Sequence, residues 1–70
     1  MIFLVSINGR VLVNGEEVES IYTVPSSDFY TSDVVLKTRK GETCYMGFNL
    51  DEVRAKALIK FYHDKLEGRE

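Results

Sequence analysis

Cys44 and His63 are the side chains whose chemistry suits nucleophilic catalysis, and the chain has one of each residue type. A catalytic cysteine needs a lowered pKa and access to solvent. The alternation of a predicted strand over residues 42–48 instead puts Cys44 on one face with Met46 and Phe48, which predicts a core position. His63 falls on the polar side of a predicted helix, near its C-terminal end, where an imidazolium favours the helix dipole. Because structural zinc needs four ligands, we expect neither a catalytic nor a metal site.

Carboxylate pairs are the second feature that could carry acid–base chemistry. Asp51 and Glu52 are explained by the start of the predicted helix, where negative charge is favourable. The acidic residues Glu16, Glu17 and Glu19 follow a turn and suit a water-facing strand edge. Neither group comes with the polar constellation that would separate the pKa values of an acid and a base. The glycines are scattered rather than grouped in a phosphate-binding loop, so we expect no enzyme and no cofactor.

Lys37, Arg39 and Lys40 form a basic cluster, and we expect Tyr45 across the hairpin from it. A sheet face with basic and aromatic side chains can hold nucleic acid through phosphate contacts and base stacking. The strand–turn–strand that leads into the helix at residues 45–55 resembles, in topology, the three-stranded AP2-type and integrase arm-binding DNA domains. The chain lacks the Arg- and Trp-rich strands with which that family reads DNA, and its net charge is −2. Nucleic-acid binding is therefore the alternative hypothesis, because such domains usually carry a basic surplus.

Length and composition indicate one small globular domain over residues 1–70. Hydrophobic residues make up 44% of the 70 positions, which excludes a disordered chain. The apolar run Met1–Val5 is far shorter than the roughly 20 residues of a membrane-spanning helix. A secretory signal has basic residues before its apolar segment, and none precedes this run, so we do not expect a secretory signal here. With Cys44 as its one cysteine, the chain forms no internal disulfide, so we expect a cytoplasmic location and no membrane contact.

Residues 2–48 carry the pattern of an antiparallel sheet of three to five strands. Runs rich in β-branched and aromatic residues predict strands at 2–7, 10–13, 16–24, 33–39 and 42–48. Asn8-Gly9 and Asn14-Gly15 are hairpin-turn signals, although the segment between them also suits a single long, irregular loop. Pro25 ends the third strand because it cannot donate to a ladder, and Lys40-Gly41 joins the last two strands.

The C-terminal segment predicts one helix over about residues 50–66, which would cover one face of the sheet. Asn49 is the expected N-cap, with Glu52 completing a capping box and Phe48 and Val53 forming a hydrophobic staple. Gly68 is the expected stop. The apolar side chains cover about half of the helix circumference, more than one buried stripe needs. They are Leu50, Val53, Ala55, Ala57, Leu58, Ile59, Phe61, Tyr62 and Leu66.

One helix covers only one face of a sheet, and this predicts an exposed apolar surface. If Val34 and Leu36 lie under the helix, the alternation puts Val35 on the far face, together with Tyr45 of the next strand. Exposed apolar patches of this kind mark protein–protein contacts. We expect the contact residues to be Val35, Tyr45, Ile59 and Tyr62.

The sequence therefore favours an α+β protein-interaction module without enzymatic activity. Its size is typical of small cytoplasmic or phage-encoded adaptors and inhibitors, which is a likeness of class only. The wide apolar arc of the helix also predicts self-association, with a homodimer as the expected form. The alternative is a nucleic-acid-binding domain that uses Lys37, Arg39, Lys40 and Tyr45.

Overall fold

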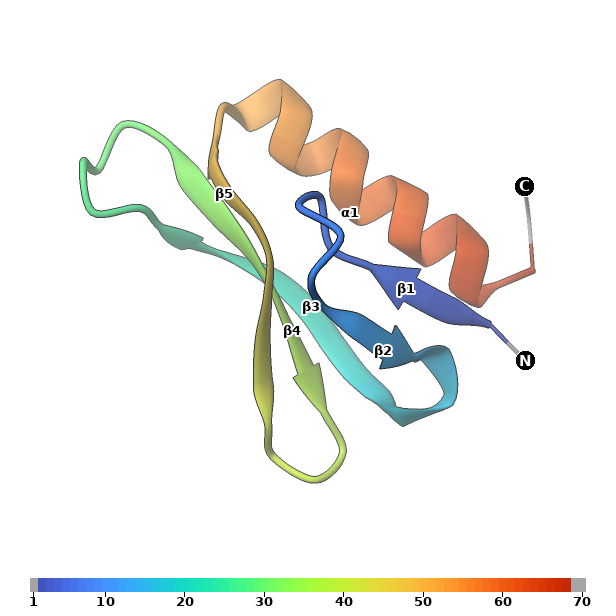
Figure 1. Ribbon diagram of the computed structural model, residues 1–70. Helices are drawn as coiled ribbons and strands as arrows, with labels where there is room; N and C mark the ends of the chain where they lie inside the picture. The colour runs from blue at the N-terminus through green and yellow to red at the C-terminus, as the bar shows by residue number, and fades with distance from the viewer. Residues whose placement is uncertain (1, 69–70) are drawn as a thin grey trace.

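The strands and the helix form an α+β fold in a computed structural model that describes residues 2–68 (Figure 1). The elements in chain order are β1 (Phe3–Val5), β2 (Leu12–Asn14), the 3-10 helix η1 (Gly15–Glu17), β3 (Val18–Pro25), β4 (Ser32–Thr38), β5 (Thr43–Leu50) and α1 (Glu52–Leu66). β1 and β2 form a two-stranded antiparallel sheet, and the three-stranded antiparallel sheet has the order β3-β4-β5. α1 packs across one face of the three-stranded sheet, over β4 most closely.

This arrangement confirms the predicted fold class, with antiparallel strands followed by one C-terminal helix. The strands divide between two sheets, and β2 is a true strand rather than part of a long loop. The Asn14-Gly15 pair does not form a tight hairpin turn. Asn14 instead caps η1, because its side chain accepts a hydrogen bond of 3.0 Å from the backbone N–H of Glu16. Met1 and residues 69–70, which the predicted domain includes, lie outside the described residues.

The β1–β2 hairpin completes the core between the sheet and the helix. The backbone N–H of Ile7 donates a 2.8 Å hydrogen bond to the carbonyl oxygen of Met46, which ties the end of the hairpin to β5. The hydroxyl of Tyr62 donates a 2.5 Å hydrogen bond to the carbonyl oxygen of Val5, which ties β1 to the helix. The buried core combines residues of β1, β2, β4, β5 and α1. They are Leu4, Val13, Val34, Leu36, Met46, Ala55 and Tyr62.

Tyr62 therefore has a structural position rather than the surface position that we expected. Its side chain is 1% exposed, because the hairpin lies against the helix on the side where Tyr62 projects. Burying an aromatic side chain of this size contributes on the order of 2–3 kcal/mol. Tyr62 thus leaves the set of predicted contact residues.

The helix begins two residues later than predicted. Asp51 is the N-cap, and its side chain accepts a 2.8 Å hydrogen bond from the backbone N–H of Arg54. The predicted cap, Asn49, has a positive φ of 54°, and β5 continues to Leu50, which pairs with Ser32. The C-terminal prediction is correct, since the helix ends at Leu66 and Gly68 follows with a φ of 78°.

Two irregularities in the β4–β5 pairing change which way Gly47 and Phe48 face. The register shifts between Val34 and Val35 and again between Ser32 and Val34, so that Val35 pairs with Tyr45, Val34 with Gly47 and Ser32 with Leu50. Such bulges insert an extra residue and reverse the alternation beyond it. Gly47 accordingly faces the helix, where an added Cβ would lie 3.2 Å from a methyl carbon of Leu58. The predicted shared face of Cys44, Met46 and Phe48 is thus wrong for Phe48, which is 55% exposed.

We predict that Tyr62→Phe lowers the free energy of unfolding by about 1 kcal/mol, because the carbonyl of Val5 loses its donor in a partly buried place. Urea denaturation monitored by circular dichroism measures this. The matched control is Tyr30→Phe, which removes a hydroxyl from a side chain that is 93% exposed and is expected to leave stability unchanged. Equal stability of the two variants would contradict the structural role of the Tyr62 hydroxyl.

Alkaline pH tests the same group in a second way. Burial raises the pKa of Tyr62 above its ordinary value of 10.0, so the folded state holds this proton more tightly than the unfolded state does. The stabilisation is complete below about pH 10 and is lost as the pH rises towards the folded-state pKa. The stability difference between the native chain and Tyr62→Phe should therefore shrink in urea titrations as the pH rises above about 10. A difference that stays constant over this range would contradict the burial of the phenol.

Candidate interaction surface

The face of the three-stranded sheet opposite the helix carries a row of aromatic side chains. Tyr22, Val35 and Tyr45 lie in register across β3, β4 and β5. The rings of Tyr45 and Phe48 stack with their centroids 5.3 Å apart and their planes 2° from parallel. Tyr22, Tyr45 and Phe48 are 38%, 42% and 55% exposed, and we call these three side chains the aromatic face. Phe48 reaches this face only because of the bulge.

Val35 lies at the centre of this face but is not accessible. It is 1% exposed, and it is not part of the core under the helix. Its in-register neighbours on the far face are the two tyrosines of the aromatic face. The predicted orientation of Val35 is therefore correct, whereas its predicted exposure is wrong. Any contact on this face would be made by the aromatic rings around Val35.

The loop between β3 and β4 presents two more aromatic side chains. Asp28 holds this loop, because its carboxylate accepts hydrogen bonds from the backbone N–H groups of Tyr30 (2.9 Å) and Thr31 (3.1 Å). These bonds lower the pKa of Asp28 below its usual range. Phe29 and Tyr30 are 83% and 93% exposed. Phe29 also has a φ of 63°, a backbone conformation that is strained for a bulky side chain.

The loop and the aromatic face are joined at one end of the sheet. Asp33 links them, since one of its carboxylate oxygens accepts a 2.6 Å bond from the Ser26 hydroxyl and a 3.0 Å bond from the backbone N–H of Asn49. Ser26 opens the loop, and Asn49 directly follows Phe48. Phe29, Tyr30 and Phe48 thus lie near the end of the sheet where Asp33 joins the loop to β5, whereas the exposed Phe3 and Phe61 belong to the hairpin and the helix.

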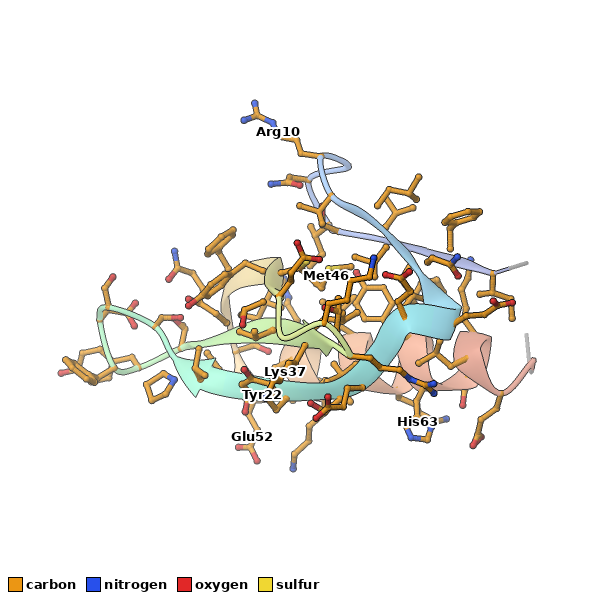
Figure 2. The ribbon with its side chains drawn as sticks, turned by 90° about the horizontal axis from the view of Figure 1, so that it is seen from below. Arg10, Tyr22, Lys37, Met46, Glu52 and His63 are labelled. Atoms are coloured by element: carbon orange, nitrogen blue, oxygen red, sulfur yellow. The ribbon has the colours of Figure 1, made fainter. Side chains whose placement is uncertain are left out.

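The predicted basic cluster divides between the sheet face and a turn. Lys37 pairs with Thr43, next to the Val35–Tyr45 pair, so Lys37 and Tyr45 share the far face as expected. Figure 2 views the molecule from below, with the helix behind the sheet, and labels Lys37 beside Tyr22. Arg39 and Lys40 lie exposed in the β4–β5 turn. Lys40 is 3.8 Å from the carboxylate of Glu17, which offsets part of the positive charge there.

The helix contributes less to the predicted surface than its apolar arc suggested. Ile59 is half-buried against the core rather than freely exposed. The row Val53, Ala57 and Phe61, which follows one helical stripe in the sequence, lies on the outer side of the helix. Lys65 covers part of this row, with its ammonium nitrogen 5.2 Å from the ring centroid of Phe61. The surplus apolar residues of the helix are therefore these outer ones.

Sequence reasoning left the orientation of Leu12, Tyr22, Phe29 and Tyr30 open, because it depends on the strand register, and it placed Phe48 on the wrong face. A signal for Phe29 and Tyr30 was present, because they lie in a segment rich in turn residues between two strands, and such loops run over the surface. Phe48 had no such signal, since its orientation depends on the bulge.

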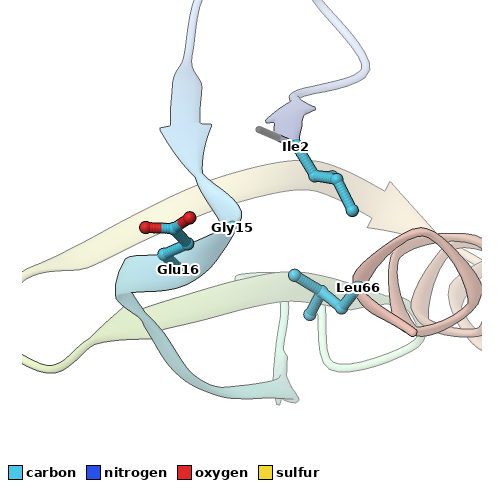
Figure 3. Close-up of a pocket in the computed structure, with 4 residues that line it drawn as sticks. All are labelled: Ile2, Gly15, Glu16 and Leu66. Atoms are coloured by element: carbon cyan, nitrogen blue, oxygen red, sulfur yellow. The ribbon is translucent and has the colours of Figure 1, made fainter. Parts of the chain in front are cut away.

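Two shallow pockets within residues 2–68 lie at the other end of the molecule. One, of about 260 Å³, is lined by Ile2, Gly15, Glu16 and Leu66 (Figure 3). Its apolar walls and single carboxylate offer no nucleophile and no second titratable group to a substrate. The second, of about 320 Å³, is bordered by Glu19 and His63 among its lining residues. His63 is exposed on the helix and lies 3.5 Å from the carboxylate of Glu67.

The side chains with metal-binding or nucleophilic chemistry are dispersed. Cys44 packs against the core from β5, while His63 lies exposed on the helix at the pocket that β3 borders. Within residues 2–68, no three His, Cys, Asp or Glu side chains gather as metal ligands would. The one α-helix in this part of the chain is too short and too polar to cross a membrane.

The strain at Phe29 leads to a stability prediction. Phe29→Gly should raise the free energy of unfolding by about 1 kcal/mol, because glycine adopts a positive φ without steric conflict. Tyr30→Gly, one residue further along the same loop, is the control, because Tyr30 has no positive φ to relieve. Thermal and urea denaturation of both variants measure the effect. A loss of stability in Phe29→Gly would mean that the ring is required by the fold.

Comparison with known proteins identifies no relative. No protein-family model matches the chain, and no curated protein or solved structure matches it. The proposals that follow therefore rest on the residues and geometry described above.

Proposed function

We propose that this chain is a small, non-enzymatic protein-interaction module that binds another protein through the aromatic face. The observation that carries this proposal is the row of Tyr22, Tyr45 and Phe48 on the sheet face that the helix leaves uncovered. Aromatic residues dominate the energetic centres of protein interfaces, because each buries a large apolar area while losing little side-chain entropy.

The loop at Phe29 supports the same proposal. A phenylalanine that is 83% exposed and held at a positive φ destabilises the isolated chain in two ways, through its backbone and through its exposed apolar ring. Strained residues of this kind cluster at binding sites. The module would therefore engage its partner with the aromatic face and with Phe29 and Tyr30 at the adjoining end.

The remaining parts of the proposal concern class, assembly and location. An adaptor or an inhibitor fits the exposed aromatic face, because such a face suits contact with another protein. We further propose that the chain self-associates as a homodimer, and that it functions in the cytoplasm, where its one cysteine stays reduced.

Nucleic-acid binding is the second candidate, favoured by the position of Lys37 beside Tyr45 on one face. Phosphate contacts would make such binding fall steeply as the salt concentration rises, whereas an apolar protein contact changes little. The pairing of Lys40 with Glu17 and the net charge of −2 favour the protein partner.

The test is affinity capture from the native host lysate with three immobilised variants. Tyr45→Ser combined with Phe48→Ser removes the aromatic stack, Val53→Ser changes an exposed apolar residue of the outer helix, and Lys37→Ala with Arg39→Ala and Lys40→Ala removes the basic cluster. We expect a protein captured by the native chain to be lost, by about tenfold or more, only with the first variant. Mass spectrometry identifies and quantifies the captured chains.

Two results would contradict the proposal. Loss of the partner with Val53→Ser, and not with the aromatic variant, would move the site to the helix. Retention of a fluorescent oligonucleotide at low salt, abolished by the triple alanine variant, would establish the nucleic-acid alternative instead. Circular dichroism of each variant shows that the loss does not reflect unfolding.

A further inference from the structure

β3 is the free edge of the three-stranded sheet. It pairs with β4 on one side, and its only hydrogen-bonded strand neighbour among residues 2–68 is β4. The opposite edge of this sheet, β5, is engaged by the hairpin through the bond from Ile7 to Met46. With eight residues, β3 is also much longer than the three-residue β2. β3 therefore offers a row of unpaired backbone groups, which sheet proteins usually protect.

The register shows which groups of β3 face outward. The backbone N–H of Ser26 donates to the carbonyl oxygen of Thr31, so Ser26 and Thr31 form a hydrogen-bonded pair just beyond the Pro25–Ser32 pair. In an antiparallel ladder such pairs recur at every second residue, so Tyr22 also directs its backbone groups towards β4. The residues between them direct their backbone N–H and carbonyl groups away from the sheet. These outward residues are Ile21, Thr23 and Pro25, and proline at an outward position is the usual arrangement in an edge strand.

We propose that a second copy of this chain pairs with β3 in antiparallel fashion about a two-fold axis at Tyr22, so that two three-stranded sheets join into one. This rests on the self-association in the proposed function and specifies the surface that makes it. In this register Ile21 of each copy faces Thr23 of the other, and each pair exchanges both of its backbone bonds. Moving the axis to Thr23 would set Ile21 opposite Pro25, which has no N–H to donate, so this incomplete pair would stand next to the central pair, whereas in the proposed register Pro25 meets Glu19 only at the end of the ladder.

The side chains of β3 fit a copy of themselves in this register. Glu19 is the one charged residue of the strand, and it lies opposite Pro25 of the second copy, so that no like charges meet. Tyr22 faces Tyr22 of the second copy in a pair without backbone bonds, where side chains are closest. Tyr22 is 38% exposed in the single chain, so it has room for this contact. The two aromatic faces would then form one continuous stripe.

The proposed pairing also gives a closed assembly of two copies. Each copy uses its long free edge, and a two-fold axis makes the contact isologous. The isologous contact uses the β3 edge of both copies, so neither β3 is left for a third copy, and β5 carries the hairpin bond from Ile7 to Met46. The expected assembly is therefore a closed dimer and not a fibre.

Charge exchange at the two-fold axis tests the proposal. Analytical ultracentrifugation should show the native chain as a dimer. Tyr22→Lys and Tyr22→Glu should each raise the dimer dissociation constant by about tenfold or more, because two like charges would face each other. An equimolar mixture of the two variants should restore the dimer, since an ammonium group of one copy would then face a carboxylate of the other. Tyr30→Lys, in the exposed loop, should dimerise like the native chain.

A covalent cross-link provides an independent arm that needs no charged variant. In a Cys44→Ala background, Tyr22→Cys should form an intermolecular disulfide on mild oxidation, because Cα atoms in such pairs lie about 4.5 Å apart. Phe48→Cys in the same background is exposed but far from the axis, so it should cross-link much more slowly.

The outcomes separate the failure of this surface from the failure of the proposed function. A monomeric native chain at high micromolar concentration would overturn both the dimer and its surface, while the aromatic-face capture experiment would stand separately. A dimeric native chain whose Tyr22 variants still dimerise alone, or whose mixture is not restored, would overturn only the β3 pairing. Equal cross-linking of Tyr22→Cys and Phe48→Cys would also overturn it.

Discussion

The surface of this chain depends on one constraint: a single helix covers a single face of the three-stranded sheet. The short β1–β2 hairpin adds its apolar residues on the helix side, where Leu4 and Val13 join the core. Nothing among the described residues covers the other face except its own side chains. Tyr22 and Tyr45 therefore shield Val35 from water and remain partly exposed themselves. The same constraint that stabilises the core thus leaves an aromatic row at the surface.

Two local features add to this surface. The bulge opposite Val34 and Val35 turns Phe48 away from the helix and onto Tyr45, so that a side chain with the composition of a core residue becomes part of the aromatic face. In the neighbouring loop, the hydrogen bonds of Asp28 hold the segment that carries the strained Phe29. Both features leave an apolar side chain, Phe48 or Phe29, exposed to water in the isolated chain. Their position at one end of the sheet is what links fold to proposed function.

Local sequence patterns were sufficient for the elements that depend on neighbouring residues alone. Strand alternation predicted that Val34 and Leu36 share one face and Val35 the other, and glycine predicted the helix end. The start of the helix was missed because Asn49 and Asp51 are both good caps, and the continuation of β5 decides between them. The exposure of Phe48 depends on pairing with another strand, and the burial of Tyr62 depends on a hairpin far away in the chain. Neither has a local signal.

Nitration of the tyrosines by tetranitromethane, followed by peptide mass spectrometry, tests the uncovered sheet face most directly. The measurement is made on the native chain at a concentration where it sediments as a monomer. We expect Tyr45 and Tyr22 to react at rates approaching that of Tyr30, while Tyr62 reacts only after unfolding, in line with their exposures of 42%, 38%, 93% and 1%. Protection of Tyr22 and Tyr45 to the same degree as Tyr62 would show that the far face is covered within one chain, and would contradict the surface on which both proposals depend.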